Sequence, residues 1–182
     1  MNRRAIIINV NMEDIPPNME NLGLLGLYHC NSNKAQKVYA SHGFTYKKGY
    51  ETHLNNVLKQ MKSKGGEVIT IQADSHDAAV AAVVKELQRD FIMPGIISVN
   101  MQNSNLQKLD ADIMRILDNT YDEDIIFIAS LSENERKSEP VLMCSKVLPI
   151  KDMGEIELLS DLAYTIAKIM HLELPKSGKS II

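Results

Sequence analysis

Uncharged amide and hydroxyl side chains gather where two apolar segments of the chain end. Segment 95–101 contains Asn100 near its end and is followed by Asn103, Ser104 and Asn105, and segment 124–130 ends in Ser130 and is followed by the apolar Leu131 and then by Ser132. Such amides and hydroxyls donate and accept hydrogen bonds, so they can hold a small-molecule ligand. The same residue types also form turns and cap helices, and this structural role is the simpler explanation.

His76 and Asp77 form a second candidate, directly after the apolar segment 67–72. An imidazole beside a carboxylate is able to work as an acid–base pair. Asp74 and Ser75 precede the pair, however, and the four residues together make an ordinary helix start with a side-chain cap and acidic charge in the first turn. We therefore favour a structural role here and keep His76 and Asp77 as the site of an alternative enzyme.

Five apolar segments predict the strands that position these residues, and they are 5–10, 67–72, 95–101, 124–130 and 140–147. Segment 124–130 is entered through an acidic turn and is then almost entirely apolar, which is typical of a strand buried on both faces. Ligands of such sheets bind beyond the carboxyl ends of the strands. Ser130 to Asn134 is therefore where chemistry is expected.

Helical spacing of apolar residues appears between these segments, at Leu54 to Met61, Val80 to Leu87, Leu106 to Leu117 and Leu158 to Met170. Strands that alternate with helices of this length predict a three-layer α/β/α sandwich with a mostly parallel central sheet. Residues 12–27 are expected to form a loop, and residues 32–40 a short helix capped by Ser32.

Composition limits the class of protein. The chain has 182 residues, of which 45% are hydrophobic, and this predicts a single domain over residues 1–182. The net charge of −3 is spread along the chain, so we expect neither nucleic acid nor a membrane surface as partner. No signal-peptide pattern is recognised, and Cys30 and Cys144 lack metal-site spacing. These features predict a cytoplasmic protein.

The order of segments from about Phe44 to the end of the chain resembles that of phosphopentomutases, which belong to the alkaline phosphatase and cofactor-independent phosphoglycerate mutase superfamily. The stretches that carry the resemblance are 42–46 (HGFTY), 65–71 (GGEVITI), 95–101 (GIISVNM), 124–134 (DIIFIASLSEN), 139–143 (EPVLM) and 158–182. The resemblance implies an alkaline phosphatase-like core. It also implies a two-metal phosphoryl-transfer site of Asp and His ligands at the strand ends.

The ligand set that the resemblance implies is missing from this chain at the matching positions. Asn9 or Asn11 stands near the first Asp, Asn103 and Asn105 stand over two further Asp residues, and Leu131 and Ser132 stand over an Asp-His pair. Asn lacks the charge by which divalent cations are held, and Leu offers no ligand at all. Residues 12–45 are interpreted as a shortened remnant where the nucleophile segment and the cap domain would be.

The resulting hypothesis is a pseudoenzyme with no metal and no cofactor, whose role is ligand binding, regulation or assembly. The alternative is a small divergent phosphomutase or phosphatase with a site rebuilt from His76, Asp77, Asn103 and Asn105. Apolar residues such as Leu24, Leu25 and Tyr28 stand in the short connection 21–43. Because exposed apolar patches mark interfaces, we also expect a homodimer or a partner protein there.

Overall fold

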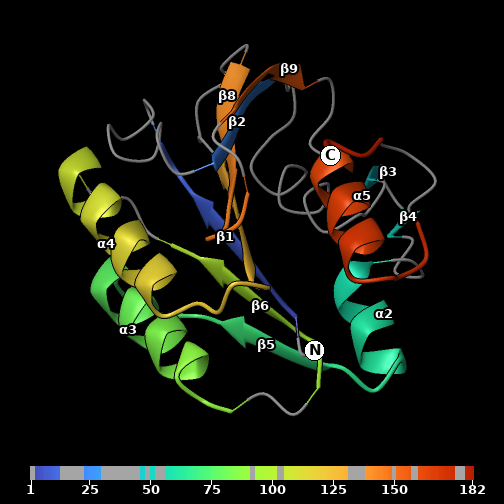
Figure 1. Cartoon of the computed structure of the whole chain (residues 1–182), viewed down its shortest axis with the longest axis horizontal. Helices are drawn as coiled ribbons and strands as arrows, with labels where there is room; N and C mark the ends of the chain where they lie inside the picture. Colours follow the sequence, from blue (N-terminus) through green and yellow to red (C-terminus); the bar gives the residue numbers. More distant parts are fainter. Residues whose placement is uncertain are drawn as a thin grey trace.

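The computed structural model describes residues 3–12, 23–29, 46–47, 50–51, 56–90, 93–101, 105–130, 138–148, 151–156, 160–174 and 179–182. In this part of the chain a seven-stranded sheet, ordered β5-β6-β1-β7-β8-β2-β9, lies between two layers of helices (Figure 1). The predicted α/β/α class is therefore confirmed.

All five predicted strands belong to this sheet. They are β1 (Arg4–Val10), β5 (Glu67–Ile71), β6 (Gly95–Asn100), β7 (Ile125–Ser130) and β8 (Ser138–Cys144). Neighbours among β5, β6, β1 and β7 are parallel, whereas β8 is antiparallel to β7. Every residue of β1 and β7 is buried, as expected of strands that helices cover on both faces.

Two strands of the sheet are not predicted by the sequence. Strand β2 (Gly23–His29) pairs antiparallel with β8 and parallel with β9 (Lys151–Ile156). The expectation of a loop over residues 12–27 is therefore wrong for its last part. Glycine has low strand propensity, and the strand forms because β8 and β9 supply hydrogen-bond partners on both sides.

Strands β3 (Tyr46–Lys47) and β4 (Tyr50–Glu51) form a separate antiparallel pair. The short helix predicted over residues 32–40 lies outside the described residues.

The four predicted helices are present as α2 (Val57–Ser63), α3 (His76–Leu87), α4 (Leu106–Asp118) and α5 (Ser160–Ile169). Asn56, Ser75 and Asn105 cap the first three through side-chain oxygens that accept backbone N–H groups. Gly65 follows α2 with a φ of 79°, a backbone conformation that favours glycine. No helix in the described ranges combines the length and apolar character needed to cross a membrane.

Alternation along the strands divides the core into two faces. Ile6, Ile8 and Val10 of β1 pack in one cluster with α3 and α4, whereas Ala5 and Ile7 pack in another with α2 and α5. Figure 1 shows these two pairs of helices on opposite sides of the sheet. We call the two sides the α3/α4 face and the α2/α5 face.

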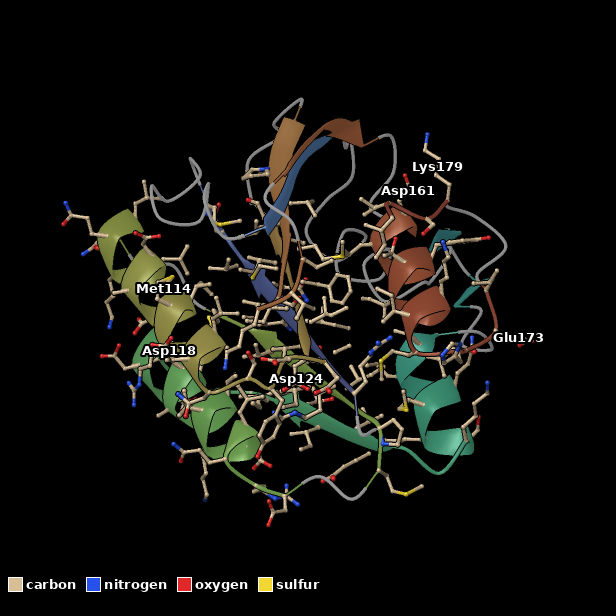
Figure 2. All side chains as sticks on the ribbon, viewed as in Figure 1. Met114, Asp118, Asp124, Asp161, Glu173 and Lys179 are labelled. Atoms are coloured by element: carbon tan, nitrogen blue, oxygen red, sulfur yellow. The ribbon has the colours of Figure 1, made fainter. Side chains whose placement is uncertain are left out.

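A fully buried ion pair fastens the amino ends of β1 and β7. Arg4 donates from Nε to both carboxylate oxygens of Asp124 at 3.0 Å and from Nη2 to Oδ2, while its backbone N–H bonds Oδ1 at 3.1 Å. Nη1 donates to the carbonyl of Leu87 at 2.8 Å, and the backbone N–H of Tyr121 donates to Asp124 at 2.8 Å. Asp124 is labelled in Figure 2. The pair is thus bonded on several sides, as a buried charge requires.

The end of the described chain runs along α5. The backbone N–H of Lys179 donates to Asp161 Oδ1 at 2.9 Å, and the N–H of Ile181 donates to Thr165 Oγ1 at 2.9 Å. Figure 2 shows Lys179 beside Asp161 at the start of this helix. These two hydrogen bonds tether the end of the described chain to α5.

Candidate ligand site at the carboxyl end of the sheet

Amide side chains meet where β1 and β6 end. The parallel register places Asn9 opposite Asn100, and Asn9 Nδ2 donates a hydrogen bond of 3.0 Å to Asn100 Oδ1. Asn9 is 1% exposed, whereas Asn100 is exposed to solvent. The carboxyl ends of these two adjacent strands thus carry a neutral hydrogen-bonded pair, at the edge where ligands of such sheets bind.

Ser130 ends β7 with a buried hydroxyl group that is used for structure. Its Oγ accepts the backbone N–H of Met12 at 3.1 Å and donates to the carbonyl of the same residue at 3.0 Å. The hydroxyl therefore ties the chain after β1 to the end of β7. Both of these hydrogen bonds engage the hydroxyl with backbone groups of Met12.

Asn11, two residues after Asn9, has a side-chain oxygen without a described hydrogen-bond partner. Its Oδ1 is buried and has no hydrogen-bond partner among the described residues. Buried side-chain oxygens are normally bonded, and an exception calls for a donor from water or from a ligand. Asn11 was predicted as a possible ligand-binding residue, and this role stays a prediction.

The alternation of side chains places further polar groups with Asn11. Residues that belong to the core of the α3/α4 face are Ile8, Val10 and Met12 near one strand end and Ile97, Val99 and Met101 near the other. The residues between them therefore lie on the α2/α5 face. We call this group, which consists of Asn9, Asn11, Ser98 and Asn100, the amide platform. A signal in the sequence was present, because each strand end carries two polar residues at i and i+2.

The other predicted ligand-binding residues have separate outcomes. Asn105 is the N-cap of α4 and accepts the backbone N–H of Lys108 at 2.8 Å, so its structural interpretation is supported. Asn103, Leu131 and Ser132 lie outside the described residues. Their roles stay predictions.

The alternative pair, His76 and Asp77, belongs to a polar network between α3 and α4. His76 Nε2 lies 2.9 Å from Asp112 Oδ2, and Lys108 Nζ lies 2.6 Å from Asp77 and 3.2 Å from Asp112. His76 is only 6% exposed, and Ser75 before it caps α3 as the structural interpretation expected. The network joins two helices on the α3/α4 face, away from the amide platform.

Ionisation in this network follows from its contacts. The hydrogen bond from Lys108, together with the charge of Lys108, lowers the pKa of Asp77 below its ordinary value. The hydrogen bonds to Asp77 and Asp112 raise the pKa of Lys108 above its ordinary value. Both shifts favour the charged forms that hold the helices together. Elsewhere in the core, burial raises the pKa of the Cys144 thiol to about 12, so this group stays protonated and inert.

The donor set of the amide platform does not fit the two-metal centre that the phosphopentomutase resemblance implies. Its four side chains are neutral, and Asn9 already donates to the oxygen of Asn100 that a metal would need. Across the described ranges, no group of three or more His, Cys, Asp or Glu residues is arranged to hold a metal ion. Hard divalent cations are held mainly by carboxylates, which the platform lacks.

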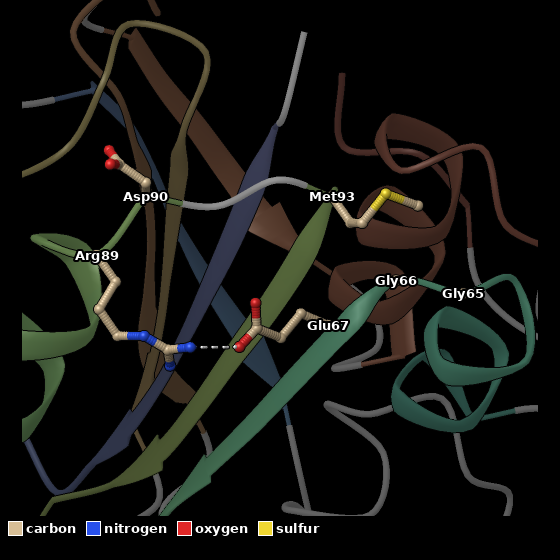
Figure 3. Close-up of a pocket in the computed structure, with 6 residues that line it drawn as sticks. All are labelled: Gly65, Gly66, Glu67, Arg89, Asp90 and Met93. Carbon is tan, nitrogen blue, oxygen red and sulfur yellow. Dashed lines mark hydrogen bonds and ion pairs between the residues drawn. The ribbon is translucent and has the colours of Figure 1, made fainter.

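A shallow hollow of about 370 Å³ lies at the amino end of β5, opposite the platform (Figure 3). It is lined by Gly65, Gly66, Glu67, Arg89, Asp90 and Met93. Arg89 and Glu67 form an exposed ion pair of 3.2 Å across it. A Cβ at Gly66 would clash with the Met61 side chain and would lie 2.9 Å from the backbone oxygen of Pro94, so glycine is needed there for packing. The charged side chains that line the hollow, Glu67, Arg89 and Asp90, are not buried.

Comparisons with known proteins locate the fold. No family model matches the chain. A protein in the alkaline phosphatase superfamily from Vibrio parahaemolyticus is similar in structure, with a TM-score of 0.77 and 10% identity over 99% of this chain and 69% of that one. The protein BT4656, solved with its substrate D-glucosamine-2-N,6-O-disulfate, has a TM-score of 0.61 and 10% identity over 99% and 79% of the two chains. At this identity the likeness is one of fold, an alkaline phosphatase-type core.

Proposed function

We propose that the chain is a catalytically inactive, phosphopentomutase-like member of the alkaline phosphatase superfamily that binds a small molecule without a metal. The observation that carries this proposal is the neutral pair Asn9 and Asn100, bonded at 3.0 Å at the strand ends. In the resembled enzymes this end of the sheet holds carboxylates and divalent cations, which depend on each other because clustered carboxylates repel unless metals neutralise them. A pair of amides is stable without a metal.

Asn11, whose buried oxygen has no partner in the described chain, supports binding as the remaining role.

The size class of the ligand is suggested by one structural neighbour. BT4656 shares the fold and takes a disulfated glucosamine as its substrate. This supports a ligand of sugar size for the present chain.

The test combines elemental analysis with assays of turnover and stability. We expect no stoichiometric Mn, Mg or Zn in the purified protein. We also expect no shift in Tm with excess Mn²⁺ or Mg²⁺, because neither metal binds the folded state. We also expect no turnover of a pentose phosphate, a phosphomonoester or a sulfate ester. A bound metal, or a metal-dependent turnover that His76→Ala abolishes, would contradict the proposal and favour the rebuilt enzyme with His76, Asp77, Asn103 and Asn105.

We also propose a homodimer or a protein partner, and a cytoplasmic location. The residues behind the association proposal, including Leu24 and Leu25, lie in β2, whose side chains are outside the described set. Its backbone pairs with β8 and β9, which removes the earlier premise that this segment is only a connection. Sedimentation at high concentration tests the association, and cell fractionation tests the location.

A further inference from the structure

The buried oxygen of Asn11 defines the kind of group that must approach it. Oδ1 is shielded from solvent and no described residue donates to it. A carbonyl oxygen accepts and cannot donate, so only an O–H or N–H group satisfies it. A fully ionised phosphate or sulfate group offers acceptor oxygens alone, and its negative charge would be repelled by the negative end of the amide dipole.

The neighbours of Asn11 on the platform are also neutral. Asn9 is bonded to Asn100, and the exposed amide group of Asn100 can both donate and accept. A group that both donates and accepts, as a hydroxyl does, matches this set. An ammonium group does not, because the platform has no carboxylate to neutralise it.

The spacing of the platform sets the size of the ligand. Residues at i and i+2 on one strand lie about 7 Å apart, and neighbouring strands lie about 5 Å apart. Asn9 and Asn11 give the first spacing, and Asn9 and Asn100 give the second. These spacings match the separations between hydroxyl groups within a ligand of monosaccharide size.

We infer that the amide platform binds a neutral polyhydroxylated ligand of monosaccharide size, and that Asn11 Oδ1 accepts a hydrogen bond from one of its hydroxyl groups. The inference rests on the proposed metal-free binding function and specifies its ligand class. It differs from the resemblance, which implies recognition of a phosphate group by metals.

The experiment measures binding of D-ribose, D-glucose and ribitol by calorimetry and by thermal shift, beside D-ribose 5-phosphate and inorganic phosphate. We expect at least one neutral compound to bind without added metal, and inorganic phosphate not to compete with it. Asn11→Ala and Asn11→Leu should each weaken binding about tenfold or more, because both remove the acceptor. Asn119→Ser, which changes an amide at the far end of α4, should leave the affinity unchanged.

The variants keep the outcomes separate. Loss of binding in Asn11→Leu alone would indicate a steric effect, and equal affinity in Asn11→Ala would overturn the role of this residue. If ribose 5-phosphate or inorganic phosphate binds and none of the neutral compounds does, the inference is overturned and metal-free binding stays intact. Binding or turnover that requires Mn²⁺ or Mg²⁺ would overturn the proposed function itself, and no binding of any compound would overturn both.

Discussion

The two ends of the sheet differ in the charge of their buried polar groups and in how those groups are hydrogen-bonded. At the amino end, Arg4 and Asp124 are both fully buried and bonded to each other and to the neighbouring backbone. At the carboxyl end the platform is neutral, and the Asn11 oxygen has no partner in the described chain. The buried charges at the amino end are thus satisfied by their contacts, whereas a buried oxygen without a described partner lies at the end where ligands of this fold class bind.

The largest effect is expected at the buried ion pair. Asp124→Asn leaves the Arg4 guanidinium buried without its counter-charge, and the loss in free energy of unfolding should be about 3–5 kcal/mol. Urea unfolding measures it. Glu123→Gln, in the same turn but less buried, is the matched control and should change stability by less than about 0.5 kcal/mol. Equal midpoints for Asp124→Asn and the wild type would show that the amino end is not fastened by charge.

A smaller loss is expected at Ser130. Ser130→Ala removes both buried hydrogen bonds to the backbone of Met12, at a cost of roughly 1–3 kcal/mol. Ser63→Ala removes an equally short bond, to Gln60, from an exposed hydroxyl and serves as the control. If both variants unfold at the same urea concentration, the hydrogen bonds between Ser130 and Met12 make no net contribution to the free energy of unfolding.

Two substitutions on the platform should act with opposite signs. Asn11→Leu replaces an unsatisfied buried oxygen by apolar atoms and should raise the free energy of unfolding by up to about 1 kcal/mol. Asn9→Leu removes a 3.0 Å hydrogen bond and should lower it by about 1 kcal/mol. Urea unfolding of the two variants gives the sign of each change in the free energy of unfolding. A loss of stability in Asn11→Leu would mean that this oxygen is satisfied in solution.

The smallest effect concerns Asp77, which is exposed. Because Lys108 lowers the folded-state pKa of Asp77, the contribution of this carboxylate is present above its unfolded pKa of about 4 and is lost as the pH falls through the lower folded value. The raised pKa of Lys108 means that the contribution of Lys108 is present below about pH 10 and is lost as the pH rises through the folded value. Asp77→Asn should therefore differ slightly from wild type in Tm between these limits, and the difference should vanish in acid. A difference that persists below pH 3 would assign the effect to packing.

The sequence could predict the elements but only part of their pairing. Periodicity located the helices and the five strands because each apolar stripe is a local pattern of residues. Strand β2 was missed because Gly23 and Gly26 weaken its local signal, while its hydrogen bonds come from β8 and β9. The structural role of Asn105 was foreseeable from its place before a helical stripe.

What the sequence by itself determined is the class of fold and the neutral chemistry at the ends of the strands, since both follow from residue types and short spacings. The tertiary structure alone decided which of these groups meet. Arg4 and Asp124 are separated by 120 positions and Asn9 and Asn100 by 91, and only the parallel register brings each pair together. The same packing shields the Asn11 oxygen from solvent, because burial depends on neighbours from distant strands and helices.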